Sequence, residues 1–509
     1  MNGLFLLLSA FAVLHGPCEK TRTDGRLELD YPIDAVVDRH DVLAIDVYLE
    51  ELLPFRWCRV CLRDESTWTT CQLNLKNIDP RRWQSVRLKL ADFKGESGAT
   101  PKLGNLKRLR LSVDLGADAD RAEDVHVELR DLRVVGPASE KDVTAECGRD
   151  SGTDPIPMKR GERRLAWDHS HRGICGRNWD VSARQAKECG FTDMIVNLAW
   201  AGCAAYRSDV VDSHPDVGRF GDQLEQCLAA CRKHGLRLHA WLVTYRIFEH
   251  LGKANLKPVF EAYERDGRLQ VGRDLKITDR WGYWICPSHP DNRRMVQEMM
   301  LELVRKGVDG IHFDYVRYAD FCGCYCQRCR ALFERKLGRR VSNWPADATG
   351  VLREDWLAFR AGLISEQVRD VSVAAHALRP SIEVSAAVFY DPRKGGESYR
   401  SSQDWRLWCA EGWLDFVCPM DYCGSSVRFR DTIEMQKNLS GKAKMYPGIG
   451  FSCWPKDGKA FSRLREQVGH CRETGFGGWT VFNLDDENLV DFLSRFAGSQ
   501  TPSVQTYLK

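Results

Sequence analysis

Two patterns of hydrophobic and polar positions divide the chain. Up to about residue 135, apolar and polar side chains alternate with a period of two, as in residues 42–48 (VLAIDVY), 85–90 (SVRLKL) and 125–132 (VHVELRDL). Alternation of this kind gives a strand one buried face and one exposed face. About six to eight such segments, separated by polar turns, predict an all-β jelly-roll sandwich over residues 25–137.

A different pattern begins at residue 164, where apolar runs of strand length alternate with amphipathic segments of helix length. The expected strands are residues 164–168, 193–198, 236–243, 310–316, 382–389, 415–421, 444–450 and 477–483. Apolar spacings of three and four predict helices between them, at residues 222–234, 292–306, 353–378 and 462–474. Eight such units predict an α/β fold, a (β/α)8 TIM barrel over residues 164–495. An open doubly wound sheet is the alternative, but no Gly-rich phosphate loop follows any of these strands.

The remaining segments are a polar linker, predicted at residues 138–163, and the N-terminus. Residues 1–17 contain an apolar run from Leu4 to Leu14 without an acidic side chain, which predicts a signal peptide and a secreted or periplasmic protein. The run is too short for a spanning helix, which needs about 20 residues, so no membrane span is expected. A buried N-terminal helix is the alternative interpretation.

Charge does not point to a nucleic-acid partner. The chain has 74 Lys and Arg against 71 Asp and Glu, a formal net charge of +3 in 509 residues. Without a strong overall field, binding to nucleic acid would need a local basic patch, and the sequence shows none. We therefore expect no nucleic-acid partner.

We look for catalytic residues where the predicted strands end, because a barrel carries its active site at the carboxyl ends of its strands. On the fourth strand, Ile311 and Phe313 share one face, while His312 and Asp314 share the other face and point into the barrel. An inward Asp is costly to bury without a partner or a task, so we predict that Asp314 is catalytic. The alternative is an ion pair with Arg317.

A second carboxylate, Asp421, ends the sixth strand in the same relative position. Two carboxylates across a barrel mouth suit cleavage of a glycosidic bond, in which one protonates the leaving oxygen and the other attacks or activates water. The same pair could hold a cation or bind sugar hydroxyls without turnover. Asp391, after the fifth strand, is a reserve acid/base, although Pro392 behind it also fits an ordered turn.

Aromatic, amide and cationic side chains occur at the other predicted strand ends. Such groups suit a sugar-binding cleft, because pyranose faces stack on rings and hydroxyls pair with amides. Each alone is more often a packing residue than a ligand contact. The predicted substrate-binding residues are His312, Asn197, His239, Trp241, Tyr245, Arg246, Arg317, Tyr422, Trp479 and Asn483.

Four cysteines follow the fourth strand within eight residues, at Cys322, Cys324, Cys326 and Cys329. Four thiolates suit a closed structural zinc site, but an exported protein also meets an oxidising compartment that favours disulfides. Such short spacings make it hard for one segment to supply all four ligands. Both interpretations stay open, and no cofactor is expected to be required for catalysis.

Three sequence blocks carry a resemblance to a known family: residues 307–318 (GVDGIHFDYVRY), 238–246 (LHAWLVTYR) and 415–422 (DFVCPMDY). They resemble the glycosyl-hydrolase-like family 10 barrels over about residues 165 to 490. The resemblance implies a glycoside hydrolase that acts on a poly- or oligosaccharide. By analogy with retaining glycosidases it also implies Asp314 as nucleophile and Asp421 as acid/base. After the Arg-Tyr pair the family often has Pro, whereas this chain has Ala319 at that position.

The β-sandwich resembles carbohydrate-binding modules of the galactose-binding type in the order of its segments. In that comparison Trp57, Trp68 and Trp83 are either sugar-stacking platforms or core residues. Two other functions compete with a hydrolase, namely a non-catalytic, lectin-like barrel and, less well supported, a metal-dependent deacetylase.

Overall fold

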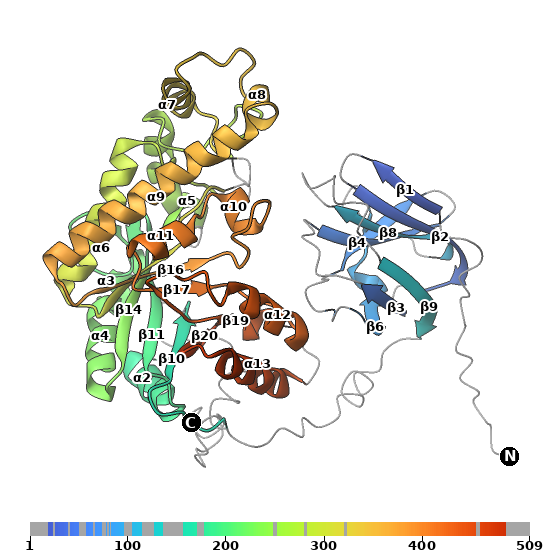
Figure 1. Ribbon diagram of the computed structural model, residues 1–509, viewed down its shortest axis with the longest axis horizontal. Helices are drawn as coiled ribbons and strands as arrows, with labels where there is room; N and C mark the ends of the chain where they lie inside the picture. Colours follow the sequence, from blue (N-terminus) through green and yellow to red (C-terminus); the bar gives the residue numbers. More distant parts are fainter. Residues whose placement is uncertain are drawn as a thin grey trace. The chain divides into compact units, whose positions relative to one another are not determined.

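A computed structural model shows two compact units (Figure 1). The structure describes residues 19–23, 26–38, 41–49, 57–64, 67–73, 78, 81, 83–95, 104–114, 127–135, 156–169, 178–247, 252–278, 282–319, 323–454 and 459–484. The predicted signal peptide and most of the predicted linker lie outside these residues. No helix in the described part of the chain is long and apolar enough to cross a membrane.

The N-terminal strands form two antiparallel sheets. The larger sheet has the order β1 (Glu19–Thr23), β2 (Arg26–Val36), β8 (Asn105–Asp114), β4 (Trp57–Arg63), β5 (Trp68–Gln72) and β7 (Lys94–Gly95). The smaller sheet has the order β6 (Gln84–Lys89), β3 (Val42–Leu49) and β9 (Val127–Val135), and the short helix η2 (Leu90–Asp92) follows β6. The alternating side chains of both sheets meet in one hydrophobic core, for example Ile45 of β3 with Leu111 of β8. The N-terminal part of the chain thus consists of β-sheets, as predicted, and two sheets that share one core are the arrangement of a sandwich.

Two of the three sandwich tryptophans lie outside that core, and the side chain of the third, Trp57, lies outside the described residues. Trp68 and Trp83 are half-buried. The guanidinium carbon of Arg110 lies 4.4 Å from the Trp68 ring centroid, and that of Arg130 lies 3.9 Å from the Trp83 ring centroid. Arginine side chains therefore stack on both rings.

The barrel sheet consists of parallel strands that pair in chain order. Its strands are β10 (Arg163–Asp168), β11 (Asp193–Ala201), β14 (Arg237–Ile247), β15 (Gly310–Asp314), β16 (Glu383–Val388), β17 (Phe416–Pro419), β18 (Lys444–Met445), β19 (Gly448–Ile449) and β20 (Gly478–Val481). The seventh strand is split: β18 pairs with β17, β19 pairs with β20, and β20 closes the ring on β10. Pro447, which has no N–H to donate, lies between the two halves. All eight predicted strands are present.

Helices follow the strands and cover the barrel. The main ones are α2 (Trp179–Glu188), α4 (Gln223–His234), α5 (Gly252–Arg265), α6 (Pro290–Lys306), α9 (Arg353–Leu378), α11 (Trp405–Glu411), α12 (Ser426–Gln436) and α13 (Ala460–Thr474). The four helices predicted from the sequence are α4, α6, α9 and α13. Their ends follow local chemistry: the side chain of Asp222 accepts a hydrogen bond from the backbone N–H of Glu225 at the start of α4, and Gly235 ends the helix in a left-handed conformation.

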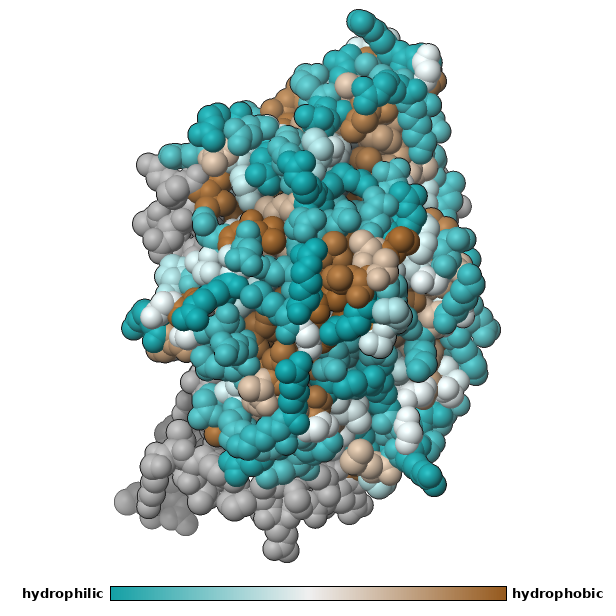
Figure 2. Space-filling view, turned by 90° about the vertical axis from the view of Figure 1, so that its left-hand side faces the viewer, coloured by the Kyte–Doolittle hydropathy of each residue, from teal (hydrophilic) through white to brown (hydrophobic). Residues whose placement is uncertain are grey.

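Shorter elements occupy the loops of the barrel. They are β12 (Cys203–Ala204), β13 (Asp212–Ser213), α3 (Pro215–Phe220), α7 (Gln327–Leu337), α8 (Ala346–Thr349), α10 (Glu397–Ser401) and η6 (Phe451–Cys453). The face seen in Figure 2 is largely hydrophilic, with hydrophobic residues in separate small patches. The amphipathic helices thus turn their polar sides to solvent.

Charged side chains fill the barrel interior at the amino ends of its strands. Arg163 donates hydrogen bonds to Asp193 (Nη2–Oδ1 2.6 Å) and to Glu383 (Nη2–Oε2 2.6 Å), and His239 Nε2 lies 3.0 Å from Asp193 Oδ1. Burial alone would raise the pKa of Asp193, but the hydrogen bonds from His239 and Arg163 outweigh it and hold that pKa well below its ordinary value. These residues lie at the amino ends of the strands, the end associated with stability in this fold.

Candidate active site

Asp314 ends strand β15 and is the inward carboxyl at the carboxyl end of the barrel. It is 7% exposed, and the backbone N–H of Tyr315 donates a hydrogen bond to its Oδ1 (2.6 Å). Burial raises the pKa of Asp314 to about 6, although this hydrogen bond and the charges of Arg317 and Arg246 oppose the rise. A carboxyl with such a pKa exchanges a proton near neutral pH.

The turn after Asp314 directs the backbone N–H of Tyr315 at this carboxyl. Tyr315 has a φ of 49°, in the left-handed region that residues other than glycine rarely adopt. Such a conformation costs on the order of 1 kcal/mol and persists where surrounding contacts hold it. The Tyr315 ring packs 5.6 Å from the Trp284 ring, which is one of those contacts.

Arg317 lies in an aromatic cage rather than in an ion pair. Its guanidinium carbon is 4.9 Å from the ring centroids of Trp284, Tyr315 and Phe389, and its Nη1 donates to the carbonyl of Tyr318 (3.1 Å). Both Arg317 and Asp314 are described, and no ion pair joins them, so the alternative of a salt bridge is wrong. Burial lowers the pKa of Arg317, which nevertheless stays a cation beside the carboxyl.

Aromatic side chains line the interior close to Asp314. The rings of Tyr422 and Phe482 are stacked at 5.2 Å, and Trp167 meets both edge-on, at 6.0 and 6.2 Å. His169 bridges the Phe482 ring (5.2 Å) and the Trp241 ring (4.5 Å). Of these residues, sequence reasoning singled out only Trp241 and Tyr422. Trp167 is the penultimate residue of the first strand, and alternation alone could have predicted its inward position.

His312 lies one layer below Asp314 and is held as a neutral ring. Its Nε2 accepts a hydrogen bond from Trp167 Nε1 (3.1 Å), and its Nδ1 lies 2.8 Å from Ser385 Oγ. Burial lowers the pKa of His312 well below its ordinary value. The neutral ring therefore carries its proton on Nδ1, and His312 positions Trp167 instead of facing the mouth.

Two predicted substrate-binding residues lie away from the mouth. His239 pairs in register with Gly310, at the start of β15, whereas Asp314 pairs with Val243. Four residues along a strand separate His239 from the level of Asp314 by about 13 Å. Trp479 faces the helical layer, with its ring 6.0 Å from the Phe191 ring and 5.7 Å from the guanidinium carbon of Arg164. The expectation that both stand at strand tops is wrong, because residue type does not encode height along a strand.

The other predicted contacts differ in their surroundings. Asn197 is buried and donates to the carbonyls of Ala199 and Trp241 (both 3.3 Å), where it bridges a bulge between β11 and β14. Asn483 donates its backbone N–H to Ser452 Oγ (2.9 Å). Arg246 approaches the Tyr315 ring (5.5 Å), and its charge acts on Asp314. Tyr245 is fully buried.

The other two predicted carboxylates, Asp421 and Asp391, each have hydrogen-bond partners of their own. Asp421 Oδ1 accepts a hydrogen bond from Gln436 Nε2 of α12 (2.7 Å), while Met420 and Tyr422 on either side pack against the barrel core. Burial raises the pKa of Asp421 well above its ordinary value. Asp391 pairs with Arg393 through both carboxylate oxygens (2.8 Å each). Neither carboxylate shares a hydrogen-bond partner with Asp314.

The cysteine cluster has a member that the spacing did not reveal. Cys324, Cys326 and Cys329 lie together as predicted, and the fourth thiol beside them among the described residues is Cys286, from the segment before α6. Cys322 lies outside the described residues. Nothing in the spacing links Cys286 to the later group, because a different loop carries it.

Replacing Asp314 with Asn is expected to stabilise the folded protein near neutral pH. Because burial raises this pKa from 3.8 to about 6, folding retains a proton that the unfolded chain releases. Wild-type stability therefore falls as the pH rises from about 4 to about 6, and the variant escapes this loss. Its advantage in free energy of unfolding should reach about 3 kcal/mol, since one pKa unit corresponds to about 1.4 kcal/mol. Urea denaturation across this pH range measures it, and an advantage that shrinks as the pH rises would contradict the assigned pKa.

The parallel eight-stranded barrel is a (β/α)8 TIM barrel, with an inward carboxyl among aromatic rings at the end of its fourth strand. The family model described as Glycosyl hydrolase-like 10 matches residues 196–447, in agreement with the resemblance found in the sequence. That segment holds strands β14 to β17 and with them Asp314.

Comparison with known proteins gives remote relatives. "Glycosyl hydrolase DigH" of Escherichia coli (strain K12) is 24% identical over 216 residues, which cover 40% of this chain and 46% of DigH. The chain thus spans about half the length of the curated relatives it matches.

Solved structures share the fold. The PgaB (BpsB) glycoside hydrolase domain from Bordetella bronchiseptica has a TM-score of 0.50 at 14% identity and covers 68% of this chain and 100% of that domain. A β-galactosidase from Bacillus circulans sp. alkalophilus has a TM-score of 0.45 at 15% identity and covers 65% of this chain and 51% of the enzyme. At these identities the likeness concerns the fold alone.

Proposed function

We propose that the barrel hydrolyses O-glycosidic bonds in a polysaccharide or oligosaccharide, with Asp314 transferring the proton. The observation that carries the proposal is the Asp314 carboxyl itself. It is buried at the carboxyl end of β15, one oxygen is fixed by the Tyr315 N–H, and its pKa is about 6. Such a group can protonate the leaving oxygen and then take a proton from water. This pKa favours an acid/base role for Asp314 over the role of nucleophile that the family analogy implies.

The surroundings of Asp314 suit a sugar ring. Trp241 and Tyr422 offer aromatic faces and edges on which a pyranose can stack, and Arg246 and Arg317 offer cations beside the carboxyl. These four residues remain our proposed substrate contacts. His312 acts indirectly, through the hydrogen bond that orients Trp167.

The partner of Asp314 in a two-carboxylate mechanism is also a proposal. Asp421 and Asp391 keep their place as candidates from the sequence. A neutral Asp421, which its raised pKa favours, could donate a proton but could not attack an anomeric carbon. Asp391 would first have to separate from Arg393.

Asp421 and Asp391 are hydrogen-bonded to Gln436 and Arg393. These bonds favour a second candidate function, which is carbohydrate binding without turnover. In that case Asp314 and the aromatic rings would bind a glycan, and no nucleophile or base would complete the reaction. The half-buried Trp68 and Trp83 of the sandwich would add binding surface in either case, once the stacked arginines move aside.

A panel of glycans separates the two functions. The purified protein is incubated with a neutral glucan, a galactan, an N-acetylglucosamine polymer and a uronic-acid polymer, and new reducing ends are measured beside binding. Hydrolysis predicts reducing ends from at least one polymer. Binding to a polymer that stays intact under every condition would favour the lectin-like barrel instead.

A further inference from the structure

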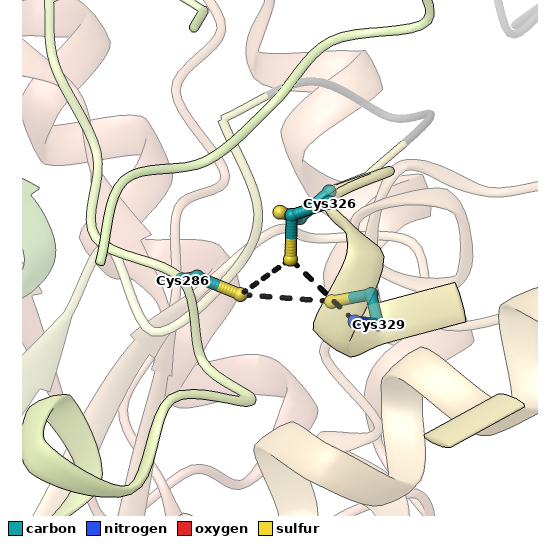
Figure 3. Close-up of side chains that lie close together, drawn as sticks. Cys286, Cys326 and Cys329 are labelled. Carbon is teal, nitrogen blue, oxygen red and sulfur yellow. Dashed lines mark hydrogen bonds between the residues drawn. The ribbon is translucent and has the colours of Figure 1, made fainter. Parts of the chain in front are cut away.

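A cluster of four cysteine thiols lies next to the candidate active site. The Sγ atoms of Cys286, Cys324, Cys326 and Cys329 all lie within 4.8 Å of one another, and all four cysteines are free. Three of these thiols, those of Cys286, Cys326 and Cys329, face one another in Figure 3. We propose that these four cysteines bind one Zn²⁺ ion in a closed structural site.

The distances between the sulfur atoms fit a tetrahedron. Cys286 Sγ lies 3.6 Å from Cys329 Sγ and 3.9 Å from Cys326 Sγ. Four sulfurs at the usual Zn–S distance of about 2.3 Å stand about 3.8 Å apart along each edge of a tetrahedron. A disulfide instead needs sulfurs about 2.05 Å apart. Zinc therefore suits the cluster as it stands, whereas disulfides require its thiols to move.

Backbone N–H groups point at the sulfurs, as a site of negative charge requires. The N–H of Val271 donates to Cys324 Sγ (3.3 Å), and the N–H of Cys329 donates to Cys326 Sγ (3.5 Å). Cys326 is also the N-cap of helix α7, whose N-terminus favours a thiolate. When the ion binds, each thiol releases one proton to water, and the four thiolates with Zn²⁺ carry a net charge of −2. These donors stabilise that charge.

The cluster has little room for a substrate or a catalytic water. Cys286, Cys324 and Cys329 are at most 1% exposed, and only Cys326 is half-buried. Ser288 Oγ also contacts the cluster, 3.1 Å from Cys286 Sγ and 3.2 Å from Cys329 Sγ. Four protein ligands without an open position define a structural site, not a catalytic one.

The ion would join the segment before α6 to the segment that follows Asp314. Cys286 follows Trp284 and Ile285, and the backbone N–H of Ile285 donates to the carbonyl of Tyr245 at the end of β14 (2.8 Å). The other three cysteines follow the Asp314–Tyr318 turn. Since Trp284 packs on Tyr315 and Arg317, a link between these segments would hold the aromatic cage in place.

The test is the metal content of the full-length chain. The protein is produced with added zinc and passed over a chelating resin, and bound metal is measured by mass spectrometry. We expect about one zinc per wild-type chain, near-complete loss in Cys324→Ser and Cys326→Ser, and full retention in Cys453→Ser, an exposed cysteine outside the cluster. Wild-type protein without metal, or equal loss of metal in Cys453→Ser, would overturn the proposal.

A spectroscopic readout keeps the test valid if the cluster variants do not fold. Wild-type protein reconstituted with Co²⁺ should show sulfur-to-cobalt charge-transfer bands and the intense visible bands of a tetrahedral site. Peptide mapping without reduction should find the four cysteines unlinked. Octahedral cobalt bands, or a disulfide between any two of the four, would overturn the proposal.

Discussion

Replacing Asp314 with Asn lowers the rate of glycan cleavage by roughly 10²–10⁴-fold if the carboxyl is the proton-transferring group, because an amide cannot supply that proton. The fold should survive, since Asn keeps the oxygen that accepts the Tyr315 N–H and the cost of burying a charge is removed. Release of reducing ends by the variant, on the polymer that the wild type cleaves, measures the effect. The circular dichroism spectrum and the unfolding midpoint report on the fold.

The matched control lies at the other end of the same strand. Asp309 precedes β15, is exposed, and accepts a hydrogen bond from the Leu238 N–H (2.9 Å), which Asn can also accept. Asp309→Asn should therefore cleave the polymer at the wild-type rate. Undiminished cleavage by Asp314→Asn would remove this residue from the mechanism, and an equal loss in both variants would mean that the effect is not specific to the mouth.

Removing the carboxylate of Asp193 should destabilise the barrel by roughly 3–5 kcal/mol, the usual effect of breaking a buried ion pair. In Asp193→Ala, Arg163 loses the hydrogen bonds that it makes to Asp193 and retains those to Glu383 and its contact with His239. Because the partners hold the pKa of Asp193 below its ordinary value, this stabilisation is present above about pH 4 and is lost as the pH falls further. Urea denaturation at pH 7 and at lower pH, followed by tryptophan fluorescence, measures both effects.

A surface ion pair is the control for this second prediction. Asp431 pairs with Arg430 on helix α12, and both side chains are more than 40% exposed. Asp431→Ala should change the free energy of unfolding by less than about 1 kcal/mol. If Asp193→Ala costs no more than Asp431→Ala, the ionic layer does not stabilise the barrel in the way that we describe.

The barrel could be predicted from the sequence because each strand is a buried apolar run with its own boundary signals. The seventh strand shows the limit of that reasoning: a single run was expected, whereas Pro447 divides it into β18 and β19. Alternation also correctly placed His312 and Asp314 on the inward face. It could not tell that His312 is engaged by Trp167 and Ser385, because those contacts join strands far apart in the chain.

The sequence did not predict how far along a strand each side chain lies, or which loops contact one another. His239 and Trp241 have the same inward direction, yet only Trp241 approaches the mouth, because two residues along the strand move a side chain by about 7 Å. Asp421 follows its strand as expected, but the chain turns after Pro419 and Asp421 meets Gln436 of α12. Cys286 joins the cysteine cluster from another loop, which resolves the difficulty of drawing four ligands from one short segment.

The most direct test of the central claim, that this barrel hydrolyses glycosidic bonds through Asp314, is cleavage in ¹⁸O-labelled water. The polymer identified in the panel is digested, the products are reduced at once, and their masses are measured. We predict one ¹⁸O atom at each new reducing end with the wild type and with Asp309→Asn, and almost no labelled product with Asp314→Asn. Products without the label, or the same labelled yield from Asp314→Asn as from the wild type, would contradict the account.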